Sequence, residues 1–123
     1  MVEDVYFFDS YAIVEIINGN PHYLPYKEVV IITTKLNLFE VCYSLLREGK
    51  DQELDEFLMY SYNYIIDFDQ ELIKEAAFFR LQHKKRNISM TDCIGYSLAK
   101  RLGIQFLTGD REFEHLDKVE FVK

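Results

Sequence analysis

The chain has 123 residues, of which 49% are hydrophobic, and its net charge at neutral pH is −7. This size and composition predict a single domain over residues 1–123 and exclude a second one. No apolar stretch is long enough to span a bilayer and no signal peptide is recognisable, so we expect a cytoplasmic protein without a membrane partner. The negative charge argues against a nucleic-acid partner, because lysine and arginine drive phosphate binding.

Short apolar runs alternate with amphipathic stretches along the chain. In the first half we expect, in order, a buried strand, a helix ended by Asn18-Gly19-Asn20-Pro21, a β-branched strand and two helices. These elements cover residues 5–8, 10–17, 29–33, 38–49 and 51–62. On the second of these helices, the pattern places Asn37, Glu40 and Ser44 opposite Leu38, Cys42 and Leu45.

The second half continues the alternation. We expect a short strand at 65–66, a helix capped by Asp69, a helix opened by Ser89, and strands at the end. The two helices run to residues 81 and 102, and the two strands cover 104–107 and 119–122. In the first of these helices Ile73, Ala76 and Ala77 are expected to face inward. Cys42 and Cys93 lie within apolar patterns, which predicts reduced, buried thiols.

Strands that alternate with helices indicate an α/β fold, with a central, mainly parallel sheet and helices on both faces. In such sheets, ligands bind beyond the carboxyl ends of the strands. Asp9 directly follows the first strand, and Asp110 follows the strand at 104–107. We therefore expect both acids at the same edge of the sheet.

Four acidic residues stand out, although each one also has an ordinary structural explanation. Asp9 fits an N-cap, and Glu40 fits a solvated helix face. Asp92 lies three residues after Ser89, as in a capping box, and turn chemistry would explain Asp110. It is their combination that points to a site, because clustered carboxylates repel one another unless cations neutralise them. Oxygen ligands favour Mg²⁺ or Mn²⁺, and a pair of such ions can promote phosphodiester hydrolysis.

The motifs around these acids resemble those of the PIN domain family, and most closely those of the small ribonucleases that include the VapC toxins. The matching segments are Phe7–Ala12, Asn37–Glu40, Ser89–Asp92 and Phe106–Phe113. The resemblance extends from Val5 to about residue 116, in the family's order and spacing.

The resemblance implies a three-layer α/β/α sandwich and an endoribonuclease that depends on Mg²⁺ or Mn²⁺. It implies that four acids are catalytic and bind the metal: Asp9, Glu40, Asp92 and Asp110. It further implies that Ser10 supports the first ligand by hydrogen bonding, that Asn37 positions Glu40, and that Thr108 steadies the last acid.

Two charged residues within the last motif, Arg111 and Glu112, are weaker candidates for the site. Arg111, beside Asp110, is a candidate for a contact with an RNA phosphate. Glu112 fits either an outer acid of the site or a solvated turn residue. The basic tract His83–Arg86 fits a solvated helix end, although its place before the Asp92 helix leaves phosphate steering open.

Several functions remain open. The leading hypothesis is the toxin of a type II toxin–antitoxin pair, blocked by an antitoxin protein. RNA processing or decay without an antitoxin is an alternative, and a non-catalytic PIN module that binds RNA or protein is another. A phosphatase is disfavoured, because Asp9-Ser10-Tyr11 stands where a nucleophilic Asp-x-Asp is expected. The aromatic segment 57–64 suggests a homodimer interface or core more than a platform for RNA bases.

Overall fold

The computed structural model describes residues 4–123, and its centre is a four-stranded parallel sheet in the order β2-β1-β3-β4. The strands are β1 (Val5–Phe8), β2 (Val30–Ile32), β3 (Gln105–Thr108) and β4 (Val119–Phe121). The two central strands, β1 and β3, end side by side, with Phe8 paired to Leu107. The residues that follow them, which include Asp9 and Asp110, therefore lie at one edge of the sheet, as predicted.

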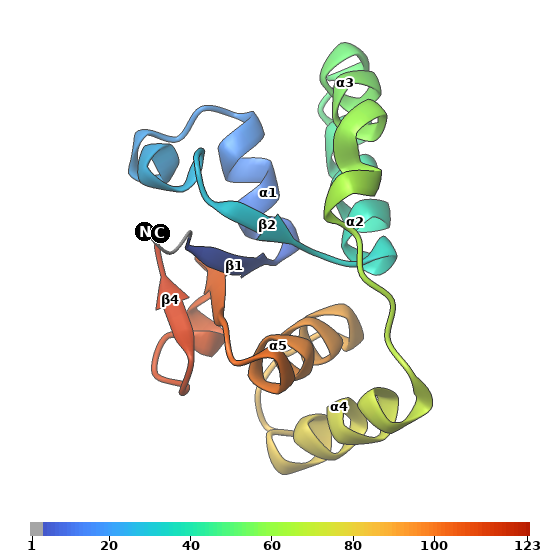
Figure 1. The fold of residues 1–123 in the computed structure, drawn as a ribbon, viewed down its shortest axis with the longest axis vertical. Coiled ribbons are helices and arrows are strands. Elements are labelled where there is room, and N and C mark those ends of the chain that lie inside the picture. The colour runs from blue at the N-terminus through green and yellow to red at the C-terminus, as the bar shows by residue number, and fades with distance from the viewer. Residues whose placement is uncertain (1–3) are drawn as a thin grey trace.

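Five helices cover the two faces of this sheet. They are α1 (Ser10–Ile17), α2 (Lys35–Arg47), α3 (Asp51–Ser61), α4 (Gln70–Gln82) and α5 (Met90–Leu102). Short 3-10 helices follow at η1 (Pro21–Tyr26), η2 (Tyr62–Tyr64) and η3 (Arg111–Phe113). Figure 1 shows α1, α2 and α3 on one side of the sheet and α4 and α5 on the other, which confirms the α/β class with flanking helices. Among residues 4–123, no helix has the length and hydropathy needed to cross a membrane.

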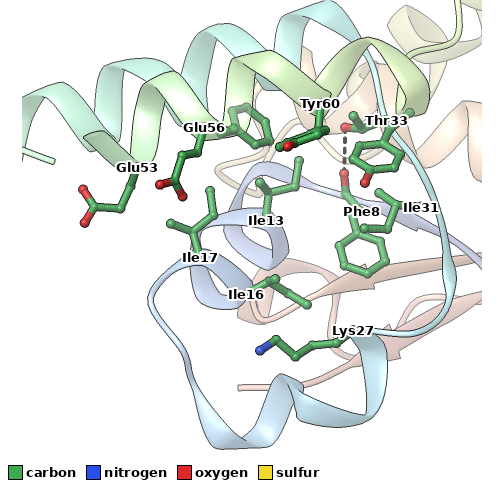
Figure 2. A pocket seen from close by; sticks show the side chains of 12 residues that line it. Phe8, Ile13, Ile16, Ile17, Lys27, Ile31, Thr33, Glu53, Glu56 and Tyr60 are labelled. Atoms are coloured by element: carbon green, nitrogen blue, oxygen red, sulfur yellow. Dashed lines mark hydrogen bonds between the residues drawn. The ribbon is translucent and has the colours of Figure 1, made fainter. Parts of the chain in front are cut away.

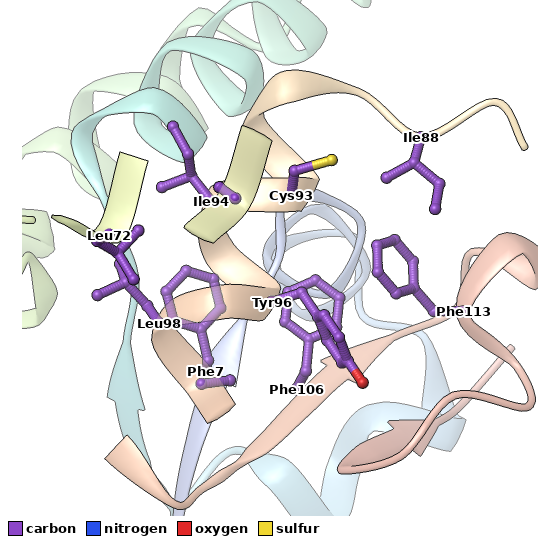
Figure 3. Packing of buried hydrophobic residues seen from close by; sticks show 11 residues of the cluster. Phe7, Leu72, Ile88, Cys93, Ile94, Tyr96, Leu98, Phe106 and Phe113 are labelled. Atoms are coloured by element: carbon purple, nitrogen blue, oxygen red, sulfur yellow. The ribbon is translucent and has the colours of Figure 1, made fainter. Parts of the chain in front are cut away.

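The strands contribute side chains to two separate hydrophobic cores, because consecutive side chains point to opposite faces of the sheet. Phe8 and Leu107 pack with α1, α2 and α3, whereas Phe7 and Phe106 pack with α4 and α5. The second core is aromatic (Figure 3), and the rings of Phe7 and Phe106 stack with centroids 5.7 Å apart. Helix α5 approaches this pair through Gly95, where a Cβ atom would lie 2.6 Å from the Phe7 ring. This close approach sets the position of the helix that carries Asp92.

The buried side of α4 differs from the prediction. Leu72 and Ala76 are buried, but Ile73 is 48% exposed and Ala77 is also exposed. Successive helical residues are rotated by about 100°, so a stripe based on Leu72 turns Ile73 and Ala77 toward solvent. Ala76 was predicted correctly, and its two partners were not.

Three smaller expectations are only partly met. Ile65 forms a single parallel bridge with Thr33 instead of a strand. Both cysteines are free, but only Cys93 is buried, since Cys42 remains partly exposed. Within the aromatic segment Tyr60 and Tyr62 are exposed, which excludes a core role for these two side chains.

Candidate active site

Asp9 is placed by the junction between β1 and α1. It is the N-cap of α1, and its Oδ1 accepts a hydrogen bond from the backbone N–H of Ala12 at 2.8 Å. Its Oδ2 accepts a hydrogen bond from the Thr108 hydroxyl. The residue is only 2% exposed. One oxygen of Asp9 therefore caps the helix, which confirms the capping explanation, and the same residue also lines a cleft.

Glu40 is oriented by a chain of hydrogen bonds between α2 and the start of α1. The Thr34 hydroxyl donates to Asn37 Oδ1 at 2.7 Å, and Asn37 Nδ2 donates to Ser10 Oγ at 3.1 Å. Ser10 Oγ then donates to Glu40 Oε1 at 2.6 Å. The prediction that Ser10 supports Asp9 by hydrogen bonding is wrong, because the Ser10 hydroxyl donates to Glu40 instead. Asn37 acts on Glu40 through Ser10.

The position of Asn37 also corrects the predicted helix face. Asn37 is fully buried and shares a side of α2 with Val41 and Leu45, whereas the sequence pattern placed it on the solvated face. A buried amide requires hydrogen-bond partners, and Thr34 and Ser10 supply them. Asn37 is therefore a buried residue whose hydrogen bonds support the site.

The remaining two acids lie at the start of α5 and the start of η3. The backbone N–H of Asp92 donates to Ser89 Oγ at 3.1 Å, which is one half of the predicted capping box. Asp110 is the N-cap of η3, and its Oδ1 accepts from the backbone N–H of Glu112 at 2.9 Å. Both acids thus lie near helix starts, where backbone N–H groups favour negative charge, but only the Asp110 carboxylate accepts a backbone hydrogen bond there.

Thr108 connects the first acid to the last. Its hydroxyl donates to the Asp9 carboxylate and accepts the backbone N–H of Asp110 at 3.0 Å. The resemblance predicted a role at the last acid, and the structure adds the bond to Asp9. Because Thr108 is fully buried, this link is shielded from water.

All four acids line one cleft of about 440 Å³. The other lining residues are Ser10, Tyr11, Ser89, Gly109, Arg111 and Lys123. Sequence reasoning had not assigned Tyr11, Gly109 or Lys123 to the site. Gly109 leaves room for the Tyr11 ring, since a Cβ atom there would collide with that ring and lie 2.5 Å from the Val122 carbonyl oxygen. The motif contained this glycine, but only the packing shows why it is needed.

Two carboxylates of the cleft, those of Asp9 and Asp92, have raised pKa values. Burial raises the pKa of Asp9 well above its usual range, and the charge of Asp92 adds to that effect. Burial, followed by the charges of Glu40 and Asp110, raises the pKa of Asp92 to about 7. Without a cation the cluster therefore disfavours its own ionised form.

The donor set fits a hard divalent cation. In residues 4–123 no three His, Cys, Asp or Glu side chains are already drawn together closely enough to hold an ion. The chemistry nevertheless suits Mg²⁺ or Mn²⁺, because the acids of the cleft offer only oxygen donors. After burial, the charges of neighbouring carboxylates contribute to the raised pKa values of Asp9 and Asp92, and such an ion would offset that repulsion. Asp9, Glu40, Asp92 and Asp110 are the residues that could hold it.

The sequence matches the family model of the PIN domain over residues 6–119. The chain belongs to the PIN domain family. No curated protein sequence matches this PIN domain. The family assignment therefore rests on the sequence model, which spans most of the chain.

Solved structures similar to this PIN domain share its fold at low sequence identity. A toxin–antitoxin complex from Klebsiella pneumoniae matches at 15% identity with a TM-score of 0.75, covering 94% of this chain and 95% of that chain. The Mycobacterium tuberculosis toxin VapC20, which cleaves the sarcin–ricin loop, matches at 18% and 0.78, covering 96% and 99%. VapBC2 from Rickettsia felis, bound to promoter DNA, matches at 21% and 0.68, covering 96% and 97%.

Proposed function

We propose that this PIN domain is an endoribonuclease that depends on Mg²⁺ or Mn²⁺ and acts as the toxin of a type II toxin–antitoxin system. One observation carries the proposal: four carboxylates from separate elements line a single cleft at the carboxyl ends of the central strands. A site of this composition suits metal-assisted hydrolysis of a phosphodiester. The similarity to VapC20, a toxin that cleaves RNA of the sarcin–ricin loop, supports the choice of RNA.

The residues of the cleft divide into metal ligands and positioning residues. Asp9, Glu40, Asp92 and Asp110 would hold the divalent ions, which when bound activate a water and stabilise negative charge on phosphate oxygens. Ser10 holds Glu40 in place, and Thr108 holds Asp9. Arg111, exposed at the rim, is suited to bind a phosphate of the substrate.

Two alternatives within the family differ in biology more than in structure. RNA processing without an antitoxin would use the same cleft and the same acids. A non-catalytic module is less consistent with the site, because all four carboxylates are present and those of Asp9, Glu40 and Asp110 are held by hydrogen bonds. The phosphatase alternative would need a second aspartate two residues after Asp9. That position holds Tyr11, which packs beside Gly109.

The proposal predicts that cleavage depends on the buried acid. Single-stranded RNA incubated with Mn²⁺ should be cut by the wild type, and Asp9→Asn should lower the rate by at least about 100-fold. Asp51→Asn, on an exposed residue of α3, is the matched control and should retain the wild-type rate. Equal cleavage by the wild type and Asp9→Asn would assign the activity to a contaminant. No cleavage by either folded protein would favour the binding module.

An antitoxin partner is supported by the electrostatics beside the cleft. A groove between α1 and α2 shares Ser10 and Glu40 with the cleft and continues past Glu15 and Glu48, so it suits a partner segment with basic side chains. The Klebsiella and Rickettsia structures are toxin–antitoxin assemblies of the same fold. A small DNA-binding protein encoded just upstream should, when added in equimolar amount, stop RNA cleavage; unchanged cleavage would count against this partner.

A second surface could anchor the apolar part of such a partner. Figure 2 shows a pocket in which Ile13, Ile16 and Ile17 of α1 face α3, with Glu53 and Glu56 at its edge. Its volume is about 410 Å³, and its lining is largely apolar. Apolar anchors that enter pockets of this kind commonly carry much of the binding energy of an interface.

The homodimer remains a prediction. It is supported by an apolar stripe on α2, where Phe39, Tyr43 and Leu46 are 74%, 58% and 54% exposed. Their spacing places them on one side of the helix, and contiguous apolar patches on a surface commonly mark an interface.

A further inference from the structure

The turn between α4 and α5 carries a group of cations that form no ion pair with an acidic side chain of residues 4–123. Lys84, Lys85 and Arg86 are all exposed. Among residues 4–123, the ion pairs involve Lys50 and Arg101, and none involves this turn. The chain as a whole has 21 acidic and 14 basic residues, so an unpaired basic cluster runs against its overall charge. These cations are available to an anionic ligand.

Lys84, Lys85 and Arg86, called the basic turn below, are connected to the rim of the acidic cleft by a hydrogen bond. Arg86 Nη1 donates to the backbone oxygen of Glu112 at 2.6 Å, and the N–H of Glu112 donates to Asp110 Oδ1 at 2.9 Å. Residue 112 thus joins the turn to one of the four acids. On the other side, Ser89 lines the cleft only three residues after Arg86. The cations are therefore held beside the site at two points.

The groove between α1 and α2 is unsuited to a phosphate backbone, although the cleft itself also contains the cation Lys123. The groove between α1 and α2 contains Glu15, Glu40 and Glu48. Within the part of the chain that the structure describes, only Glu48 of these three forms an ion pair, with Lys50 Nζ at 3.8 Å. A polyanion entering this groove would meet repulsion. Arg111, in contrast, lines the cleft and opens η3, the short helix whose Glu112 is bonded to Arg86. Favourable charge for an RNA strand thus lies on the η3 side.

We propose that the basic turn and Arg111 form a track that binds the RNA backbone next to the scissile phosphodiester. Lys84 and Lys85 contact phosphates of the strand as it leaves the cleft, and Arg111 contacts a phosphate nearer to the acids. Arg86 positions the turn through its bond to Glu112. The inference rests on the proposed ribonuclease function. Contacts to phosphates position a strand without reading its sequence, so the track serves many RNA sequences.

Charge neutralisation with a matched control tests the track. Lys84→Gln/Lys85→Gln removes two cations from the turn. The control, Lys27→Gln/Lys74→Gln, removes two exposed cations elsewhere, so it has the same net charge as the turn variant. Cleavage of a single-stranded RNA with Mn²⁺ is measured for both variants and the wild type at 50 and 200 mM salt. We expect KM of the turn variant at 50 mM to rise several-fold, with kcat within about twofold of the wild type.

The salt dependence separates a direct contact from a general charge effect. Each phosphate contact to a single strand contributes a slope of about 0.7 in log affinity against log salt. Loss of two contacts lowers this slope by about 1.4. Between 50 and 200 mM salt, the RNA affinity of the turn variant should therefore fall about sevenfold less than that of the wild type. A turn variant with the same KM and salt dependence as the Lys27/Lys74 control would overturn the proposal. That result would fit a turn that meets an acidic protein segment instead.

Failure of the proposed function is distinguished by the wild type. If the wild type cuts no RNA, the ribonuclease proposal fails, and the track is then judged by binding alone. Fluorescence anisotropy of a labelled single-stranded RNA with Asp9→Asn, with and without the turn substitutions, supplies that measurement. Weaker binding on substitution of Lys84 and Lys85 supports the track, and unchanged binding overturns it.

Discussion

At the scale of single residues, the site is organised by hydroxyl groups that connect segments far apart in the sequence. Ser10 links Asn37 to Glu40, and Thr108 links Asp9 to Asp110. Groups that orient metal ligands commonly affect metal affinity or activity by about 10–100-fold. The two hydroxyls are therefore positioning groups for three of the four acids, Asp9, Glu40 and Asp110.

Removal of the first hydroxyl should misplace Glu40. Ser10→Ala leaves the buried Asn37 amide without its acceptor and Glu40 without its donor. We expect cleavage to fall about 10–100-fold and the free energy of unfolding to fall by about 1–3 kcal/mol. Ser44→Ala, one turn beyond Glu40 on α2, is the control and should change neither strongly. Partial recovery of cleavage in Ser10→Thr would confirm the role of the hydroxyl, and wild-type cleavage by Ser10→Ala would contradict it.

The raised pKa of Asp92 predicts a pH dependence of stability in the metal-free protein. Its pKa rises from 3.8 to about 7, mainly through burial, so the native state favours the protonated carboxyl. Stability from this group is complete below pH 4 and is lost as the pH rises through 7. Asp9 acts in the same direction. With EDTA present, the wild type should therefore unfold at a lower temperature at pH 8 than at pH 5.

Asp92→Asn supplies the control for this dependence. Each unit of pKa shift corresponds to about 1.4 kcal/mol, and partial solvent access reduces the effect to roughly 1–3 kcal/mol. The variant should show a shallower loss of Tm between pH 5 and 8, measured by calorimetry. Saturating Mg²⁺ should raise the wild-type Tm more at pH 8 than at pH 5. Parallel pH profiles of the variant and the wild type would rule out this assignment.

At the scale of elements, α5 links the aromatic core to the site. Gly95 of this helix packs against Phe7 and Phe106, and the first turn of the helix carries Asp92. A shift of this helix would therefore change both the packing of the core and the position of a carboxylate. The η3 helix has a similar double role, because Phe113 is buried in the core while Asp110 caps its start.

Gly95→Ala tests the link between core and site. The added Cβ atom would lie 2.6 Å from the Phe7 ring and 3.2 Å from the Phe106 ring. Overpacking of this kind costs about 1–3 kcal/mol, and it outweighs the gain of about 1 kcal/mol that alanine brings to a helix. We expect a lower free energy of unfolding in urea and a lower cleavage rate under native conditions. A variant as stable and as active as the wild type would show that α5 has room to adjust.

At the scale of the whole molecule, the parallel sheet was predictable from the sequence because its signals are local. Short apolar runs marked the strands, and Ser89 and Gly103 marked the ends of α5 as N-cap and C-cap. The sheet rule then placed Asp9 and Asp110 at one edge, and the structure confirms that placement. Local patterns were sufficient wherever one element alone decided the outcome.

What could not be predicted depends on contacts between elements. On α4, Ile73 and Ala77 were wrongly assigned to the inward side, where the structure has Leu72 beside Ala76. The choice between Leu72 and Ile73 depends on the packing of α4 against α5. The bond from Asn37 to Ser10 joins residues 27 positions apart, and nothing in either segment specifies the pairing. Lys123 likewise enters the cleft only because the chain returns to it after β4.

The central claim is that the four acids of this PIN domain form one divalent metal site, and Mn²⁺ binding tests it most directly. Mn²⁺ titrated into metal-free protein and followed by electron paramagnetic resonance should bind to the wild type and be displaced by Mg²⁺. Asp9→Asn should weaken Mn²⁺ binding by at least about tenfold, and Asp51→Asn should leave it unchanged. Mn²⁺ binding that is equally tight in Asp9→Asn and the wild type would contradict the account.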